Sequence, residues 1–115
     1  MDSILTSVKK MLGINEDYEH FDPDIIMHIN NVFMVLVQIG VGPPNGFAIK
    51  DKTSVWSDFI PDTHWFSHSI PTYVYQKVRL IFDCPTGSLL EALKESIREM
   101  ECRLNIAAET TTTNA

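Results

Sequence analysis

The feature that most constrains this chain is the stretch over residues 22–40, DPDIIMHINNVFMVLVQIG. Asp22 is a suitable N-cap, Pro23 suits a first helical turn that needs no amide donor, and Gly40 supplies a stop. Apolar residues cover most of the helix circumference between these signals, which predicts that the helix is buried. The polar residues form only a narrow seam, made of Asp24, His28, Asn31 and Gln38.

Length and composition indicate one small globular domain. A chain of 115 residues with 44% hydrophobic residues is long enough to bury a core. Polar residues interrupt the central run, which is therefore shorter than the roughly 18 apolar residues of a membrane span. We recognise no signal peptide and expect the chain to stay where it is made. Cys84 and Cys102 lack CxxC spacing, which predicts reduced thiols.

Three further segments have the periodicity of amphipathic helices and can cover the central one. Residues 3–12 space their apolar residues by three and four and end before Gly13. Residues 69–82 follow the same rule, with Pro71 tolerated in the first turn. Residues 88–108 open with a capping box and continue as an apolar seam of Leu90, Leu93, Ile97, Met100, Leu104 and Ala107. The sequence therefore predicts an all-α bundle of about four helices.

The segments between and after these helices are irregular. Two prolines and three glycines over residues 40–52 predict a long loop, either a plain connector or a projecting contact loop with a charged tip. Residues 54–60 predict a helix of one or two turns. Residues 109–115 contain no core-forming side chain, so we expect a flexible C-terminal tail after a single domain over residues 1–108.

The residues that could carry chemistry do not form a recognisable site. His64 and His68 have the spacing of two metal ligands, but Pro71 disturbs the helix and no further ligand has matching spacing. Cys102 lacks a glycine-rich oxyanion turn nearby, and His28 lies on the seam of a helix. We therefore expect no enzyme activity, no metal and no cofactor.

Four large aromatic residues lie in a segment with little regular structure to bury them: Trp56, Phe59, Trp65 and Phe66. They either cap the core or remain exposed at a protein interface.

Four segments together resemble the small helical head-to-tail connector proteins of siphovirus-type bacteriophages, also called adaptor or head-completion proteins. In order, they are MDSILTSVKKMLGI, YEHFDPDIIMHINNVFMVLVQIGVGP, TYVYQKVRLIFDCP and ECRLNIAAE. The resemblance runs from Met1 to about Glu109 and rests on structural motifs. It implies a virion protein without enzyme activity, assembled in the host cytoplasm. It also implies a ring of about twelve copies (a dodecamer) beneath the portal, which extends the DNA channel and forms the platform for the stopper or tail.

This resemblance also implies partners and residue roles. The partners are further copies of the chain, the portal protein, and a stopper or tail-completion protein, with no membrane. Double-stranded DNA would pass without sequence-specific binding, which suits a formal net charge of −6. The expected subunit interface comprises Trp56, Phe59, Trp65, Phe66, Lys94, Arg98 and Arg103. An acidic face toward the channel or a neighbouring subunit comprises Glu91, Glu95 and Glu99. Loop contacts fall on Lys50, Asp51 and Lys52, and portal binding falls on Thr110, Thr111, Thr112 and Thr113, unless that run is a frayed terminus.

The alternative function is a small cytoplasmic helical module that regulates or binds another macromolecule. A helix that reads DNA needs a basic exposed face, whereas the most basic helix, around Lys77 and Arg79, is largely apolar. A neighbouring virion part such as a stopper is a further alternative, although those proteins tend to be rich in β-structure.

Overall fold

The computed structural model describes residues 3–113 and their side chains as far as Glu109. The chain forms α1 (Ile4–Met11), α2 (Asp22–Ile39), α3 (Trp56–Phe59), the 3₁₀ helix η1 (Ser67–Ser69), α4 (Ile70–Phe82) and α5 (Gly87–Thr113). Within these residues no strand forms, and β-structure is limited to one isolated bridge between Ser3 and Val55. The predicted all-α bundle is therefore confirmed, and its short helix at 54–60 is the single turn α3.

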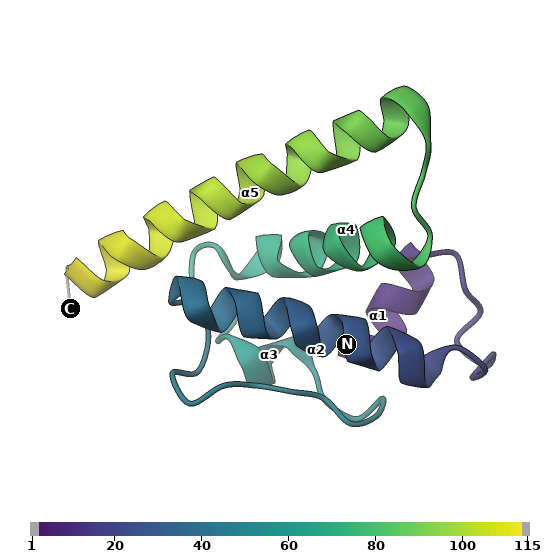
Figure 1. The fold of residues 1–115 in the computed structure, drawn as a ribbon. Helices are drawn as coiled ribbons and strands as arrows, with labels where there is room; N and C mark the ends of the chain where they lie inside the picture. The colour runs from purple at the N-terminus through teal and green to yellow at the C-terminus, as the bar shows by residue number, and fades with distance from the viewer. Residues whose placement is uncertain (1–2, 114–115) are drawn as a thin grey trace.

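The core of the bundle lies between α2 and α4. Figure 1 shows these helices side by side, with α5 on α4 and α1 packed near the end where α2 begins. The buried side chains of α2 recur every three or four residues: Ile25, Ile29, Val32, Phe33 and Leu36. From α4 they meet Ile70, Tyr73, Val74 and Val78. Burial of these two stripes is the main term that stabilises the fold.

The first turn of α2 differs from the prediction. Asp22 is not the N-cap but the first helical residue, and Phe21 occupies the cap position without a side-chain hydrogen bond. The reason is that the Asp22 carboxylate pairs instead with Lys9, at 2.9 Å between Oδ1 and Nζ. Asp22 still lies at the positive end of the helix dipole. The helix ends as predicted, with Gly40 in the left-handed region at φ 106°.

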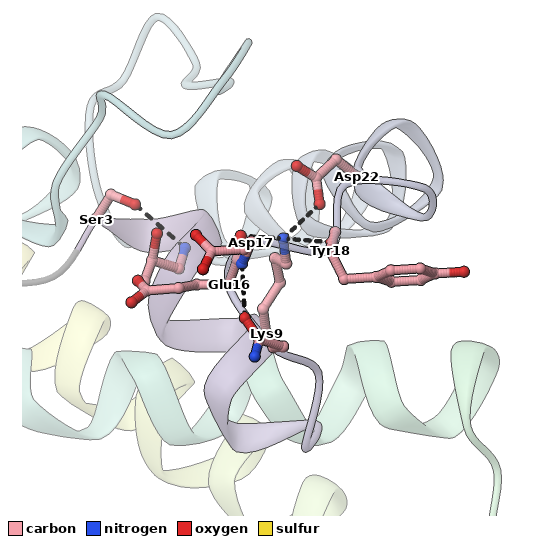
Figure 2. Close-up of polar contacts among 8 residues, drawn as sticks. Ser3, Lys9, Glu16, Asp17, Tyr18 and Asp22 are labelled. Carbon is pink, nitrogen blue, oxygen red and sulfur yellow. Dashed lines mark hydrogen bonds and ion pairs between the residues drawn. The ribbon is translucent and has the colours of Figure 1, made fainter.

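Lys9 is a buried charge that ties the N-terminal segments together. Its side chain is only 2% exposed, and Figure 2 shows its ammonium group between the linker and the start of α2. The Nζ atom donates to the carbonyls of Glu16 at 2.9 Å and Tyr18 at 2.8 Å, in addition to its ion pair with Asp22. We call these four residues the Lys9 latch. It anchors the acidic linker between α1 and α2.

The long loop after α2 is held by two specific contacts. The Asn30 side chain donates to the Ile49 carbonyl at 3.0 Å and accepts from the Ile49 amide at 2.8 Å, as a neighbouring strand would. Gly42 lies at φ 90°, and a Cβ there would overlap the ring of Phe59. The loop is thus fastened to the bundle, although it has no regular secondary structure.

α5 packs through the predicted seam. Leu93, Ile97, Leu104 and Ala107 are buried, while Leu90 and Met100 are half-buried. Two hydrogen bonds tie this helix to α4, from Tyr73 Oη to Glu101 Oε2 at 3.0 Å and from Gln76 Nε2 to Ser96 Oγ at 2.8 Å.

The end of α5 differs from the prediction, because the helix continues past residue 108 to Thr113. Two alanines and a glutamate at 107–109 are good helix formers, and adding a residue to an existing helix is easier than starting one. If residues 110–113 bind the portal by adding a strand to one of its sheets, this last turn must unwind first. The side chains of these threonines lie outside the described residues, as do residues 114–115, so the predicted tail function stays a prediction.

Candidate functional site

The four aromatic residues singled out in the sequence have two different environments. Trp56, Phe59 and Phe66 are buried in the core. Trp56 donates through Nε1 to Ser7 Oγ at 3.2 Å, and the Phe59 ring lies 4.5 Å from that of Phe33. Trp65 is 71% exposed, and its ring meets the edge of Phe66, with 5.2 Å between ring centres. Of the four, Trp65 is the residue whose ring is available to a partner.

Trp65 forms one wall of a groove against the C-terminal part of α5. The groove has a volume of about 520 Å³. The segment around η1 supplies Trp65, Phe66, His68 and Ser69, and α5 supplies Met100, Arg103, Leu104, Ile106 and Ala107. We call this feature the Trp65 groove. It brings together Trp65 and Arg103, two residues that the sequence analysis assigned to a subunit interface from segments far apart in the chain.

The position of the Trp65 groove follows from the packing of α5. Leu104 and Ala107 face the core, and Gly40 at the end of α2 comes close enough that a Cβ there would lie 3.4 Å from the Cβ of Ala108. This packing places residues 104–108 of α5 at the end of the bundle where α2 finishes, on the left in Figure 1. Ile106, next to Arg103 at the open side of the groove, is left 57% exposed.

The charged side chains predicted for the interface all lie on the exposed face of α5. Lys94, Arg98 and Arg103 are exposed, as are Glu91, Glu95 and Glu99. Two pairs form along the helix, Arg98 with Glu95 at 2.7 Å and Arg103 with Glu99 at 2.8 Å. Exposed pairs of this kind contribute little to stability, so Arg103 can exchange its partner at low cost. The predicted acidic face is therefore a surface of mixed sign.

The loop tip at Lys50, Asp51 and Lys52 is exposed, as a contact loop requires. The Asp51 carboxylate accepts hydrogen bonds from the side chain and the amide of Thr53, and these bonds lower the pKa of Asp51. Because they also close a turn, the tip has a defined shape. A shallow hollow of about 240 Å³ lies between this tip and the start of α2, next to Pro23 and Ile26.

The two histidines with ligand-like spacing point to different surroundings. The His64 ring packs on Phe66, with 4.5 Å between ring centres, whereas His68 lies at the Trp65 groove. His64 also borders a second hollow of about 470 Å³, beside the glycines that follow α2. Within the part of the chain that the structure describes, no three His, Cys, Asp or Glu side chains are grouped so that they could hold a metal ion.

α2 has an exposed face that the sequence analysis missed. The helix was expected to be buried, but Met27 and Met34 are more than half exposed. They share one side of the helix with the polar residues of the predicted seam, which makes up what we call the α2 stripe: Asp24, Met27, Asn31, Met34 and Gln38. The signal was present in the sequence, because the polar residues at 24, 31 and 38 mark the solvent side, and positions 27 and 34 fall on that side.

Among the described helices, none combines the length and the apolar character needed to cross a membrane.

Comparisons with known proteins place the chain in a family. Neither a curated protein nor a solved structure matches the chain. The family of phage connector proteins matches it over residues 4–111. This match covers nearly the whole described chain, so the chain belongs to the phage connector protein family, a family of structural phage proteins.

Proposed function

We propose that this protein is a head-to-tail connector, or adaptor, that forms a ring under the portal of the phage head. The ring extends the DNA channel and provides the docking platform for the stopper or tail. Family membership and the helical fold support a structural connector role. The resemblance of the N-terminal, central and C-terminal segments to head-completion proteins supports the position in the particle.

The observation that carries the ring proposal is the Trp65 groove. Tryptophan and arginine are the residue types most enriched at the energetic centres of protein interfaces. Trp65 is exposed in the single chain, and Arg103 and the exposed Ile106 lie in the same groove. A small domain that leaves such a cluster open to water has a surface suited to another protein chain.

The charge of the chain supports the passage of DNA. Each copy has a formal charge of −6, and a ring would multiply it around the channel. Phosphate groups are repelled by such a surface, so DNA would slide without sticking. The acidic side chains Glu91, Glu95 and Glu99 are exposed on α5 and are available either to the channel or to a neighbouring subunit.

Two further segments contact partners in the proposed assembly. The loop tip at Lys50, Asp51 and Lys52 projects a defined charged surface toward a partner, and the threonine run 110–113 reaches the portal. The loop tip is exposed, so changes to it should affect docking without affecting the fold.

Sedimentation velocity and negative-stain images of the purified protein, alone and mixed with portal protein, test this function. We expect ring-shaped particles of many chains, in solution or on the portal. A protein that stays a monomer of 13.1 kDa and does not bind the portal would contradict the proposal and favour a small helical regulatory or protein-binding module.

A further inference from the structure

The α2 stripe carries two methionines that the described part of the chain leaves more than half exposed, between the polar side chains of Asp24, Asn31 and Gln38. Met27 is 53% exposed and Met34 is 56% exposed. They lie two turns apart on the same side of α2, a separation of about 10 Å along the helix axis. Methionine is flexible and polarizable, and it packs well against irregular apolar surfaces and aromatic rings. The stripe is therefore better suited to fill a groove than to meet a flat surface.

The Trp65 groove has the shape and lining that such side chains need. Its volume of about 520 Å³ lies within the range of roughly 300–1,000 Å³ that is usual for protein pockets. The buried side chains of Phe66 and Leu104 belong to its lining, and the exposed side chains of Trp65 and Ile106 stand beside them. The groove thus offers an aromatic ring and aliphatic groups to a pair of thioether side chains.

The charges on these two surfaces are complementary. Copies that each carry a formal charge of −6 repel one another, so a contact between them must form where acidic groups are few. Residues 25–49 contain no Asp, Glu, Lys or Arg, and Asp24 is the one formal charge of the α2 stripe. Of the described residues that line the groove, only Arg103 carries a formal charge. The stripe therefore carries one negative charge. The groove carries one positive charge, which forms an exposed ion pair with Glu99 at 2.8 Å in the single chain and can exchange that partner at low cost.

From these observations we infer that the Trp65 groove of one copy receives the α2 stripe of the next copy in the ring. This inference rests on the proposed function, because it names the partner of the groove within the ring. Met27 and Met34 enter the groove against Trp65 and Ile106, and Asp24 lies on the side of α2 that faces Arg103. The contact buries apolar surface of both copies at the points where their mutual repulsion is weakest.

The symmetry of this contact agrees with a ring. The stripe belongs to α2, whereas the groove belongs to the segment before α4 and to α5, so the two surfaces are different. A pair of copies joined in this way still has one open stripe and one open groove, and further copies add until the ring closes. A contact of stripe with stripe, or of groove with groove, would stop at a dimer.

Two single substitutions test the inference, M34E in the stripe and I106E in the groove. Each places a carboxylate in an apolar contact, and each replaces an exposed residue, so the fold should be retained. Helical circular dichroism checks the fold, and M34K and I106K serve as second variants if either protein is damaged. The matched control is L89E, which places the same charge on the exposed Leu89 at the far end of α5.

Sedimentation velocity gives the expected outcome under conditions where the unmodified protein forms rings. M34E alone and I106E alone should each fall to single chains, while L89E should form rings. An equimolar mixture of M34E and I106E should stop at particles of two chains, because only the intact stripe of I106E and the intact groove of M34E can join. No other arrangement of these two surfaces gives a two-chain limit in the mixture and single chains in the separate samples.

The other outcomes separate this inference from the proposed function. Rings from both M34E and I106E would overturn the inference and leave the connector ring intact. Rings from M34E but not from I106E would show that the groove takes a different segment, which also overturns it. If I106E forms rings but no longer binds portal protein, the occupant is the portal. Unmodified protein that never assembles, with or without portal protein, would remove the ring and the inference together.

Discussion

The two ends of the bundle differ in what they bury. At the end where α2 begins, the Lys9 latch places an ammonium group almost out of contact with water, at 2% exposure. At the end where α2 finishes, the Trp65 groove leaves a tryptophan 71% exposed. Both reverse the usual rule that charges lie outside and large apolar groups lie inside.

The difference lies in where each group finds its partners. The Lys9 ammonium group finds two carbonyls and a carboxylate within the chain, all at 2.8–2.9 Å. A buried charge with such partners is satisfied within the chain, and removal of one partner leaves the others without compensation. The Trp65 ring meets the edge of Phe66 but stays 71% exposed, so most of its apolar area is left for another chain. The first end therefore serves the fold, and the second serves assembly.

Replacement of Lys9 by methionine should give the largest effect on stability. K9M keeps the length of the side chain but leaves the half-buried Asp22 carboxylate and two carbonyls without their donor. We expect the free energy of unfolding to fall by about 3 kcal/mol. Urea denaturation of the monomer measures this change. K94M, at an exposed position on α5, is the control and should change stability by less than about 0.5 kcal/mol. Equal effects of the two variants would mean that the latch is not structural.

Sequence periodicity predicted the helices and most of the core, because helical spacing of apolar residues and the stops at Gly13 and Gly40 are local signals. The Lys9 latch was not predictable in this way. Its partners are backbone carbonyls in an irregular linker, and their direction depends on the tertiary structure. For the same reason the sequence predicts Asp22 as an N-cap, whereas in the structure its carboxylate forms an ion pair with Lys9 of α1.

Replacement of Tyr73 should give an intermediate effect, because it is a second buried polar group that finds its partner inside the chain. Y73F removes the hydrogen bond to Glu101 between α4 and α5. We expect the free energy of unfolding to fall by about 1.5 kcal/mol. This is the lower end of the range for a hydrogen bond to a charged group, because Glu101 is about one-third exposed. Thermal and urea unfolding measure it. Y18F, at the exposed Tyr18, should have little effect.

The same hydroxyl gives a dependence on pH. Burial, and then the adjacent Glu101 carboxylate, raise the pKa of Tyr73 above its ordinary value of about 10. Above pH 10 the unfolded chain therefore binds fewer protons than the folded one, and stability falls as the pH rises. Below pH 10 this group gives no dependence. Y73F should show a smaller loss between pH 9 and 11 than the unmodified protein, and an identical loss in both would contradict this assignment.

The candidate site was predicted only in part. The sequence named Trp65 and Arg103 but could not separate them from Trp56, Phe59 and Phe66, because composition does not tell which side of a short irregular segment faces the core. The structure separates them by burial. The methionines of α2 were missed because that helix was predicted to be buried, and Ile106 was missed because it lies outside the apolar seam predicted for residues 88–108. An exposed apolar residue on a mostly buried helix is visible only when the neighbours of that helix are placed.

Replacement of Trp65 should have the smallest effect on the single chain and a large effect on assembly. W65A removes a side chain that is 71% exposed, so the free energy of unfolding of the monomer should change by less than about 0.5 kcal/mol. Assembly should weaken strongly, because the exposed ring is the largest apolar group of the groove. Urea unfolding and sedimentation on the same sample measure the two effects, with L89A as the control for loss of an exposed apolar side chain. If W65A destabilises the monomer as much as K9M does, both ends of the bundle serve the fold, and the contrast between them is lost.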